Sequence, residues 1–105
     1  MGYSALAEPG VKPVFDEMMG QKALKNNIFS FAVGSSPEMT LGYYDKSKFR
    51  GDIHWNPIEF KYMYGIKLDD IKVNGKNLHI CSGQPSCLVT IDSGSSMNAF
   101  PDFAH

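Results

Sequence analysis

Residues 88–96 read LVTIDSGSS, an apolar run followed directly by an acid, a hydroxyl residue, a glycine and two further hydroxyl residues. The apolar run favours a β-strand, and Gly94 permits a tight turn directly after it. We expect the Asp92 carboxylate at the end of this strand on an apolar floor, where the Ser95 hydroxyl can donate a hydrogen bond to it. Desolvation and hydrogen bonding together are typical of a catalytic acid. A turn that only caps a strand has the same spacing, so this stretch alone leaves both interpretations open.

Two cysteines, Cys81 and Cys87, precede this stretch and enclose a small polar loop. They can close the loop as a disulfide if the compartment is oxidising. A metal site that also uses His79 is a second interpretation, but the five intervening residues exceed the spacing of zinc knuckles and no fourth ligand is evident. Unlinked thiols in a reducing compartment are a third.

Short strand-like segments account for most of the chain from Ile28 onward. The expected strands are residues 28–33 and 38–41, which form a hairpin around a four-residue loop, then 52–55, 60–73, 78–80 and 88–91. The side-chain parity of 60–73 switches near Asp69 and Asp70, which predicts a bulge or bend there. Asn74-Gly75 is typical of a type I′ hairpin turn. A single helical turn is expected within residues 43–49.

One short amphipathic helix is expected near the N-terminus, over residues 13–21. Its apolar residues recur at helical spacing, and Asp16 and Glu17 lie near the positive end of the helix dipole. Pro13 suits the first turn of a helix, because backbone N–H groups there have no acceptor within the helix and proline loses no hydrogen bond by lacking one. The sequence therefore predicts a mainly β fold with one helix.

Composition excludes several classes of function. The chain has 105 residues, 43% of them hydrophobic, and a net charge of −1, so it fits at most one small domain. That charge is too small for the positive field of non-specific nucleic-acid binding. No run approaches the roughly 18 apolar residues of a membrane span, and the first residues lack the layout of a signal peptide. We therefore expect no nucleic-acid partner, no membrane span and no targeting segment in these residues.

Several motifs together resemble the pepsin-like aspartic proteases, the family of pepsin, cathepsin D and the plasmepsins. DSGSS at 92–96 resembles the second of that family's two Asp-Thr/Ser-Gly-Ser/Thr active-site loops. Other segments follow in the family's order: KPVFD at 12–16, NIFS at 27–30, EMTLG at 38–42, FRGDIHWNP at 49–57 and YGIKLDDIKVNG at 64–75. The resemblance covers nearly the whole chain.

The resemblance implies a fold and a set of site residues. Residues 1–105 would be the interlobe segment and the first part of the C-terminal lobe of a bilobal acid protease, a partial aspartic-protease domain without a complete second domain. The implied roles are a catalytic Asp92, an active-site loop, a substrate-binding wall and a disulfide. The loop residues are Ser93, Gly94 and Ser95; the wall residues are Thr90, Met63 and Tyr64; the disulfide joins Cys81 and Cys87. No metal and no other cofactor is implied.

The implied function is that of an aspartic-type endopeptidase, in which two aspartates activate a water at acid pH. This chain would supply one of the two and be inactive alone. Its partners would be a polypeptide substrate and the remaining lobe, and its location secreted, lysosomal or vacuolar. A non-catalytic, aspartic-protease-like protein that only binds polypeptides is the alternative. A retroviral-type homodimer, in which two copies of Asp92 form the pair, is a further one.

Overall fold

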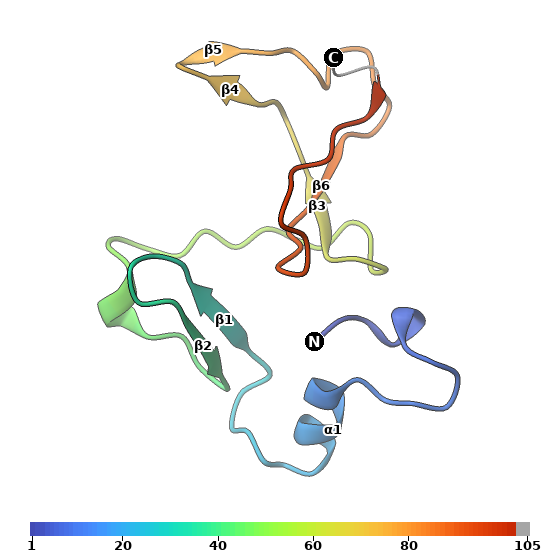
Figure 1. Ribbon diagram of the computed structural model, residues 1–105, viewed down its shortest axis with the longest axis vertical. Coiled ribbons are helices and arrows are strands. Elements are labelled where there is room, and N and C mark those ends of the chain that lie inside the picture. Colours follow the sequence, from blue (N-terminus) through green and yellow to red (C-terminus); the bar gives the residue numbers. More distant parts are fainter. Residues whose placement is uncertain (103–105) are drawn as a thin grey trace. The chain divides into compact units, whose positions relative to one another are not determined.

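A computed structural model describes residues 1–102 of the chain, so the last three residues of the expected partial domain lie outside the described part. The residues divide into two units that we describe separately. The first holds Met1 and Ala7–His54, and the second holds Gly2–Leu6 with the residues from Trp55 onward. Figure 1 follows the chain through both.

The first unit contains the α-helix, α1 (Val14–Gly20), which Pro13 precedes as the N-cap residue. Two acidic residues lie in its first turn, as the helix dipole favours. Phe15 on this helix is 6% exposed, and its ring packs edge-on against that of Phe29, with 5.3 Å between the centroids. The predicted amphipathic helix is thus confirmed, one residue shorter at each end, and Phe15 is its anchor.

A β-hairpin follows α1 in the first unit (Figure 1). Its strands are β1 (Phe29–Ala32) and β2 (Glu38–Leu41), which pair antiparallel with Phe29 opposite Leu41. The 3₁₀ turn η2 (Lys46–Lys48) comes next, and the Asp45 carboxylate caps it by accepting the Ser47 N–H at 2.8 Å. Both the hairpin and the single helical turn match the prediction from sequence.

The second unit contains two further strand pairs and the short 3₁₀ helix η1 (Ser4–Leu6). β3 (Gly65–Lys67) pairs antiparallel with β6 (Leu88–Thr90). β4 (Lys72–Val73) and β5 (Lys76–Asn77) form a hairpin whose two turn residues, Asn74 and Gly75, both have positive φ, at 49° and 79°. The predicted type I′ hairpin is confirmed. At the place of the predicted bulge or bend, β3 ends at Lys67 and β4 begins at Lys72. Over residues 1–102 the fold is mainly β with one α-helix.

Three expected strand segments are wrong or too long. Residues 52–55 do not form a strand in the described part of the chain, and Pro57 follows them without an N–H to donate. Residues 61–64 form a turn, because Phe60 and Gly65 exchange two backbone hydrogen bonds, of 3.0 and 3.1 Å, and close it. Residues 78–80 leave the hairpin after Leu78, whose N–H donates to Ile71 O at 2.8 Å.

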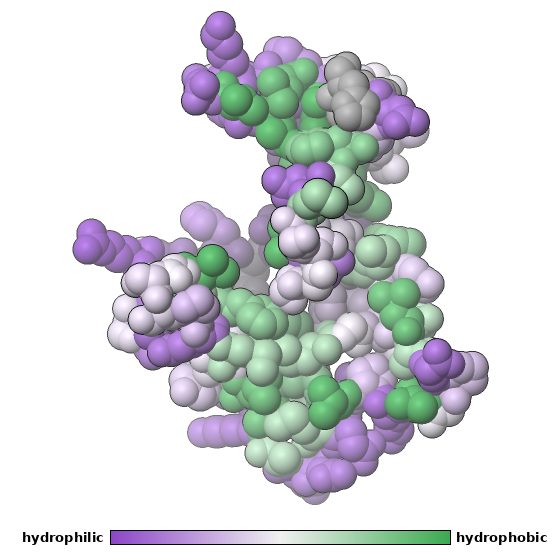
Figure 2. Space-filling view, in the orientation of Figure 1, coloured by the Kyte–Doolittle hydropathy of each residue, from purple (hydrophilic) through white to green (hydrophobic). Residues whose placement is uncertain are grey.

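Many apolar side chains of the described residues face solvent. Phe15 is the one buried hydrophobic side chain among residues 1–102, whereas Trp55, Ile91 and Met97 are 70%, 76% and 83% exposed. Figure 2 shows hydrophobic side chains on the visible face of the molecule. Among these same residues, no helix is both long and apolar enough to cross a membrane.

Candidate active site

Asp92 lies two residues after β6, and its own loop holds both oxygens of its carboxylate. The Gly94 N–H donates to Oδ1 at 2.8 Å, and the Ser95 hydroxyl donates to Oδ2 at 3.0 Å. The Ser95 N–H also donates to the Asp92 backbone carbonyl at 3.3 Å, which closes the turn. The hydrogen bond expected from Ser95 is therefore present, and these contacts fix the carboxylate in one orientation.

Gly94 lies too close to the carboxylate to carry a side chain without rearrangement. A Cβ atom built on Gly94 would lie 3.1 Å from Asp92 Oδ1, which is tighter than an ordinary van der Waals contact. The glycine thus allows the backbone N–H to reach the carboxylate. The role of Gly94 is to let its own backbone come close to the Asp92 carboxylate.

The expected desolvation of Asp92 is wrong for this chain. Asp92 is exposed, as are Ser93, Gly94, Ser95 and the neighbouring Ile91. Strand β6 does lead into the acid as predicted, but residues 91–100 are all exposed and leave the carboxylate uncovered. Hydrogen bonding, rather than burial, defines the environment of Asp92 here.

Two cavities of the second unit border Asp92. The larger, of about 630 Å³, is lined by Asp92, Ser95, Thr90 and Met63 together with apolar side chains that include Met97 and Phe100. The smaller, of about 130 Å³, is lined by Asp92, Thr90, Met63 and Tyr64 on one side. The structure therefore brings the three predicted wall residues to the carboxylate. Ser93 is not among the described residues that line either cavity.

Sequence reasoning missed the N-terminal contribution to this region. Tyr3 and Leu6 line the smaller cavity from the segment that contains η1. The Tyr3 ring packs on the Tyr64 ring, with 4.5 Å between the centroids. No local pattern connects residues so far apart along the chain, so the sequence carries no signal for this contact.

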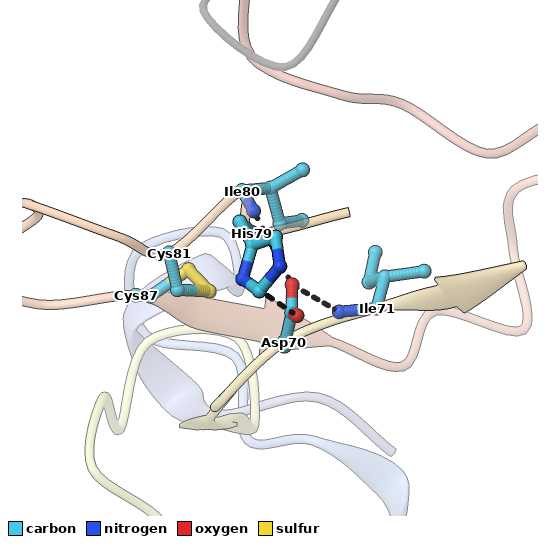
Figure 3. A network of polar contacts seen from close by, with 6 residues as sticks. All are labelled: Asp70, Ile71, His79, Ile80, Cys81 and Cys87. Carbon is cyan, nitrogen blue, oxygen red and sulfur yellow. Dashed lines mark hydrogen bonds and ion pairs between the residues drawn. A yellow bond between two sulfur atoms is a disulfide. The ribbon is translucent and has the colours of Figure 1, made fainter. Parts of the chain in front are cut away.

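Asp70 forms a second carboxylate network, between β3 and β4 (Figure 3). Its Oδ1 accepts the Ile71 N–H at 2.8 Å and the Ile80 N–H at 3.2 Å, and its Oδ2 lies 3.9 Å from His79 Nδ1. Partial burial raises the pKa of the Asp70 carboxyl. Hydrogen bonds from the backbone N–H groups of Ile71, His79 and Ile80, together with the nearby His79 side chain, lower the pKa by more than burial raises it. The pKa of Asp70 therefore lies below its ordinary value. Asp70 thus ties both ends of the β4–β5 hairpin together.

A disulfide joins Cys81 and Cys87 beside this network (Figure 3). Both thiols are consumed by this bond, so the metal site and the unlinked thiols considered as alternatives are ruled out for these cysteines. The Leu68 N–H donates to Cys87 O at 2.8 Å, which extends the pairing of β3 with β6 up to the disulfide. The bond therefore closes the loop directly before the strand that leads to Asp92.

The Asp70 network predicts a specific pH dependence. A carboxyl whose pKa is lowered by folding stabilises the fold fully above the unfolded value of 3.8, and this contribution is lost as pH falls through the lower folded value. We expect the Ile71 and Ile80 amides of the full-length protein to stay protected from hydrogen exchange down to about pH 4. Asp70→Asn is expected to reduce that protection at neutral pH and to weaken its loss in acid.

Asp69→Asn is the matched control for Asp70→Asn. The Asp69 side chain is 93% exposed, and its ion pair with Lys67 is 3.8 Å long. Exposed pairs of this kind contribute little to stability. Equal exchange rates at Ile71 and Ile80 in the two variants would contradict the role given to Asp70.

Comparisons with known proteins show the family of the chain. A protein-family model described as eukaryotic aspartyl protease matches residues 1–104. The chain is 36% identical to cathepsin E of Oryctolagus cuniculus, 38% identical to cathepsin E of Cavia porcellus and 36% identical to embryonic pepsinogen of Gallus gallus. Each match covers 96% of this chain and 26% of the relative, so the chain spans about a quarter of the length of these proteins. The chain belongs to the eukaryotic aspartyl protease family.

Proposed function

We propose that this chain is the part of an aspartic endopeptidase that supplies one of two catalytic aspartates, Asp92. The observation that carries the proposal is the carboxylate of Asp92, held through both oxygens by Gly94 and Ser95 at the border of two cavities. Oδ1 accepts a hydrogen bond from the Gly94 N–H and Oδ2 accepts one from the Ser95 hydroxyl, and each oxygen has a further lone pair. Asp92 can therefore accept a hydrogen bond from a water while its loop keeps it in place.

The proposed reaction needs a second carboxylate from the rest of the parent protein. The ionised aspartate takes a proton from the water, whose oxygen attacks the carbonyl carbon of the peptide bond. The protonated aspartate donates its proton to the carbonyl oxygen, which gives a tetrahedral intermediate with two hydroxyl groups. As the C–N bond breaks, the leaving nitrogen takes the proton that the first aspartate removed from the water, and one hydroxyl group of the intermediate returns its proton to the second aspartate. Because two carboxylates in one site share a proton, we expect activity at acid pH.

The lining of the cavities supports a polypeptide substrate with bulky apolar residues. Thr90, Met63 and Tyr64 form the substrate-binding wall, and apolar side chains predominate around them. Burial of apolar surface is the main favourable term in such binding. We take the exposed apolar side chains of residues 1–102 to be covered by the remaining lobe of the protease.

The disulfide supports a location for the full protein. Cys81 and Cys87 pair in this chain, and disulfides persist in oxidising compartments. We therefore propose that the protease acts after secretion or in a lysosome or vacuole.

The test compares the full-length protein with the isolated 105-residue chain. At acid pH, we expect the full-length protein to cleave peptides that carry bulky apolar residues, and the isolated chain to cleave none. Cleavage by a stable dimer of the isolated chain would instead favour a pair made of two Asp92 residues. Binding without cleavage by the full-length protein would favour the non-catalytic alternative.

A further inference from the structure

The N-terminal segment packs against the turn that borders Asp92. Tyr3 and Tyr64 are both half-buried, and their rings lie 4.5 Å apart with 37° between their planes. The Leu6 N–H donates to Tyr3 O at 3.0 Å and closes the helical turn η1 behind the Tyr3 ring. Tyr3 is thus placed by its own local structure and not only by Tyr64.

Tyr64 has an unusual backbone conformation. Its φ is +51°, in the left-handed region that aromatic residues rarely adopt. Such conformations persist only where the surrounding structure holds them. Here the two hydrogen bonds between Phe60 and Gly65 close the turn, and a Cβ atom on Gly65 would lie 2.8 Å from Phe60 Cβ. The turn is therefore tight at its base, and the Tyr3 ring packs on its last residue.

Met63 connects this turn to the carboxylate. It directly precedes Tyr64, and it lines both cavities that border Asp92. Tyr3 itself lines the smaller cavity, of about 130 Å³. A shift of the Tyr64 backbone would move the Met63 side chain, and the loss of the Tyr3 ring would also open the cavity directly.

We infer that Tyr3 is a positioning residue that sets the size of the smaller cavity beside Asp92, and that this cavity holds one apolar side chain of a polypeptide substrate. Tyr3 acts by packing on Tyr64 and so holding the turn that carries Met63. The inference rests on the proposed function, since it concerns the selectivity of that reaction. It assigns a role in selectivity to a residue that does not adjoin the catalytic loop in sequence.

The test measures selectivity in the full-length protein. For each position around the cleaved bond, a pair of peptides carries either leucine or phenylalanine at that position and is otherwise identical. kcat/KM is measured for both peptides of each pair. Tyr3→Leu enlarges the cavity and is expected to shift the Phe/Leu ratio of kcat/KM towards phenylalanine by about tenfold, at one substrate position only. Tyr3→Phe keeps the ring and is expected to retain the parent ratio.

Two further variants make the result decisive. Tyr3→Trp places a larger ring against Tyr64, so it is expected to shift the ratio towards leucine at that same position even if Tyr3→Leu is too unstable to assay. Tyr43→Leu is the control, because Tyr43 is a 58% exposed tyrosine of the other unit. A merely structural role for Tyr3 would lower activity towards all peptides alike, and unchanged ratios in the assayable variants would overturn the inference.

Asp92→Asn in the same assay separates this inference from the proposed function. Full activity in Asp92→Asn would refute the function itself. An inactive Asp92→Asn together with unchanged ratios in the Tyr3 variants would refute the inference alone.

Discussion

Replacing Asp92 with asparagine in the full-length protein is expected to lower kcat/KM for peptide cleavage at acid pH by about 10²–10⁴-fold, the usual contribution of a positioned acid or base. Asparagine has nearly the same shape, and its amide oxygen can accept the hydrogen bond from Gly94 or from Ser95. It cannot take up a proton from the water. The loss therefore reports on the chemistry of the carboxylate rather than on the structure of the loop.

Asp69→Asn is the control for this substitution, and circular dichroism shows whether each variant is folded. Asp69 follows β3, its side chain is 93% exposed, and it is not among the described residues that line the two cavities. We expect its activity to equal that of the parent. Equal activity in Asp92→Asn and the parent would refute the assignment of Asp92 as a catalytic residue.

The features that the sequence predicted correctly depend on neighbouring residues. The Asn74-Gly75 turn follows from two positive φ angles that these residue types tolerate. The hydrogen bond from Ser95 to Asp92 spans three positions, and α1 follows from helical spacing after Pro13. In each case the atoms that decide the structure lie within a few residues of one another, so the order of residue types is sufficient.

The features that the sequence did not predict depend on residues far apart. Tyr62 and Tyr64 alternate as in a strand, but the bonds between Phe60 and Gly65 close a turn there. A strand at residues 52–55 would need a neighbouring strand, and the pattern of residues along the chain does not show which segment lies beside it. The packing of Tyr3 on Tyr64 is likewise invisible to any local rule.

The environment of Asp92 shows the same division. Its hydrogen bonds come from its own loop, and the one from Ser95 was expected from the sequence, whereas the expected burial is not found. An apolar strand before an acid indicates where the acid lies along the chain. It does not indicate what covers it.

Replacing Gly94 with alanine is expected to lower kcat by about 10²-fold, the effect of a misplacement of about 1 Å in a catalytic group. The added Cβ would lie 3.1 Å from Asp92 Oδ1, so either the carboxylate or the backbone must move. Either movement lengthens the 2.8 Å hydrogen bond from the Gly94 N–H. The carboxylate then loses one of the two contacts that orient it towards the water.

Gly34→Ala is the matched control, because a Cβ atom on Gly34 meets nothing within 4 Å and Gly34 lies in the loop between β1 and β2. We expect it to leave kcat and KM unchanged. In Gly94→Ala, KM is expected to change less than kcat, since the cavity walls formed by Met63 and Thr90 remain in place. If Gly94→Ala raises KM and leaves kcat unchanged, the result would contradict the role of Gly94 in orienting the carboxylate. It would assign Gly94 to substrate binding instead.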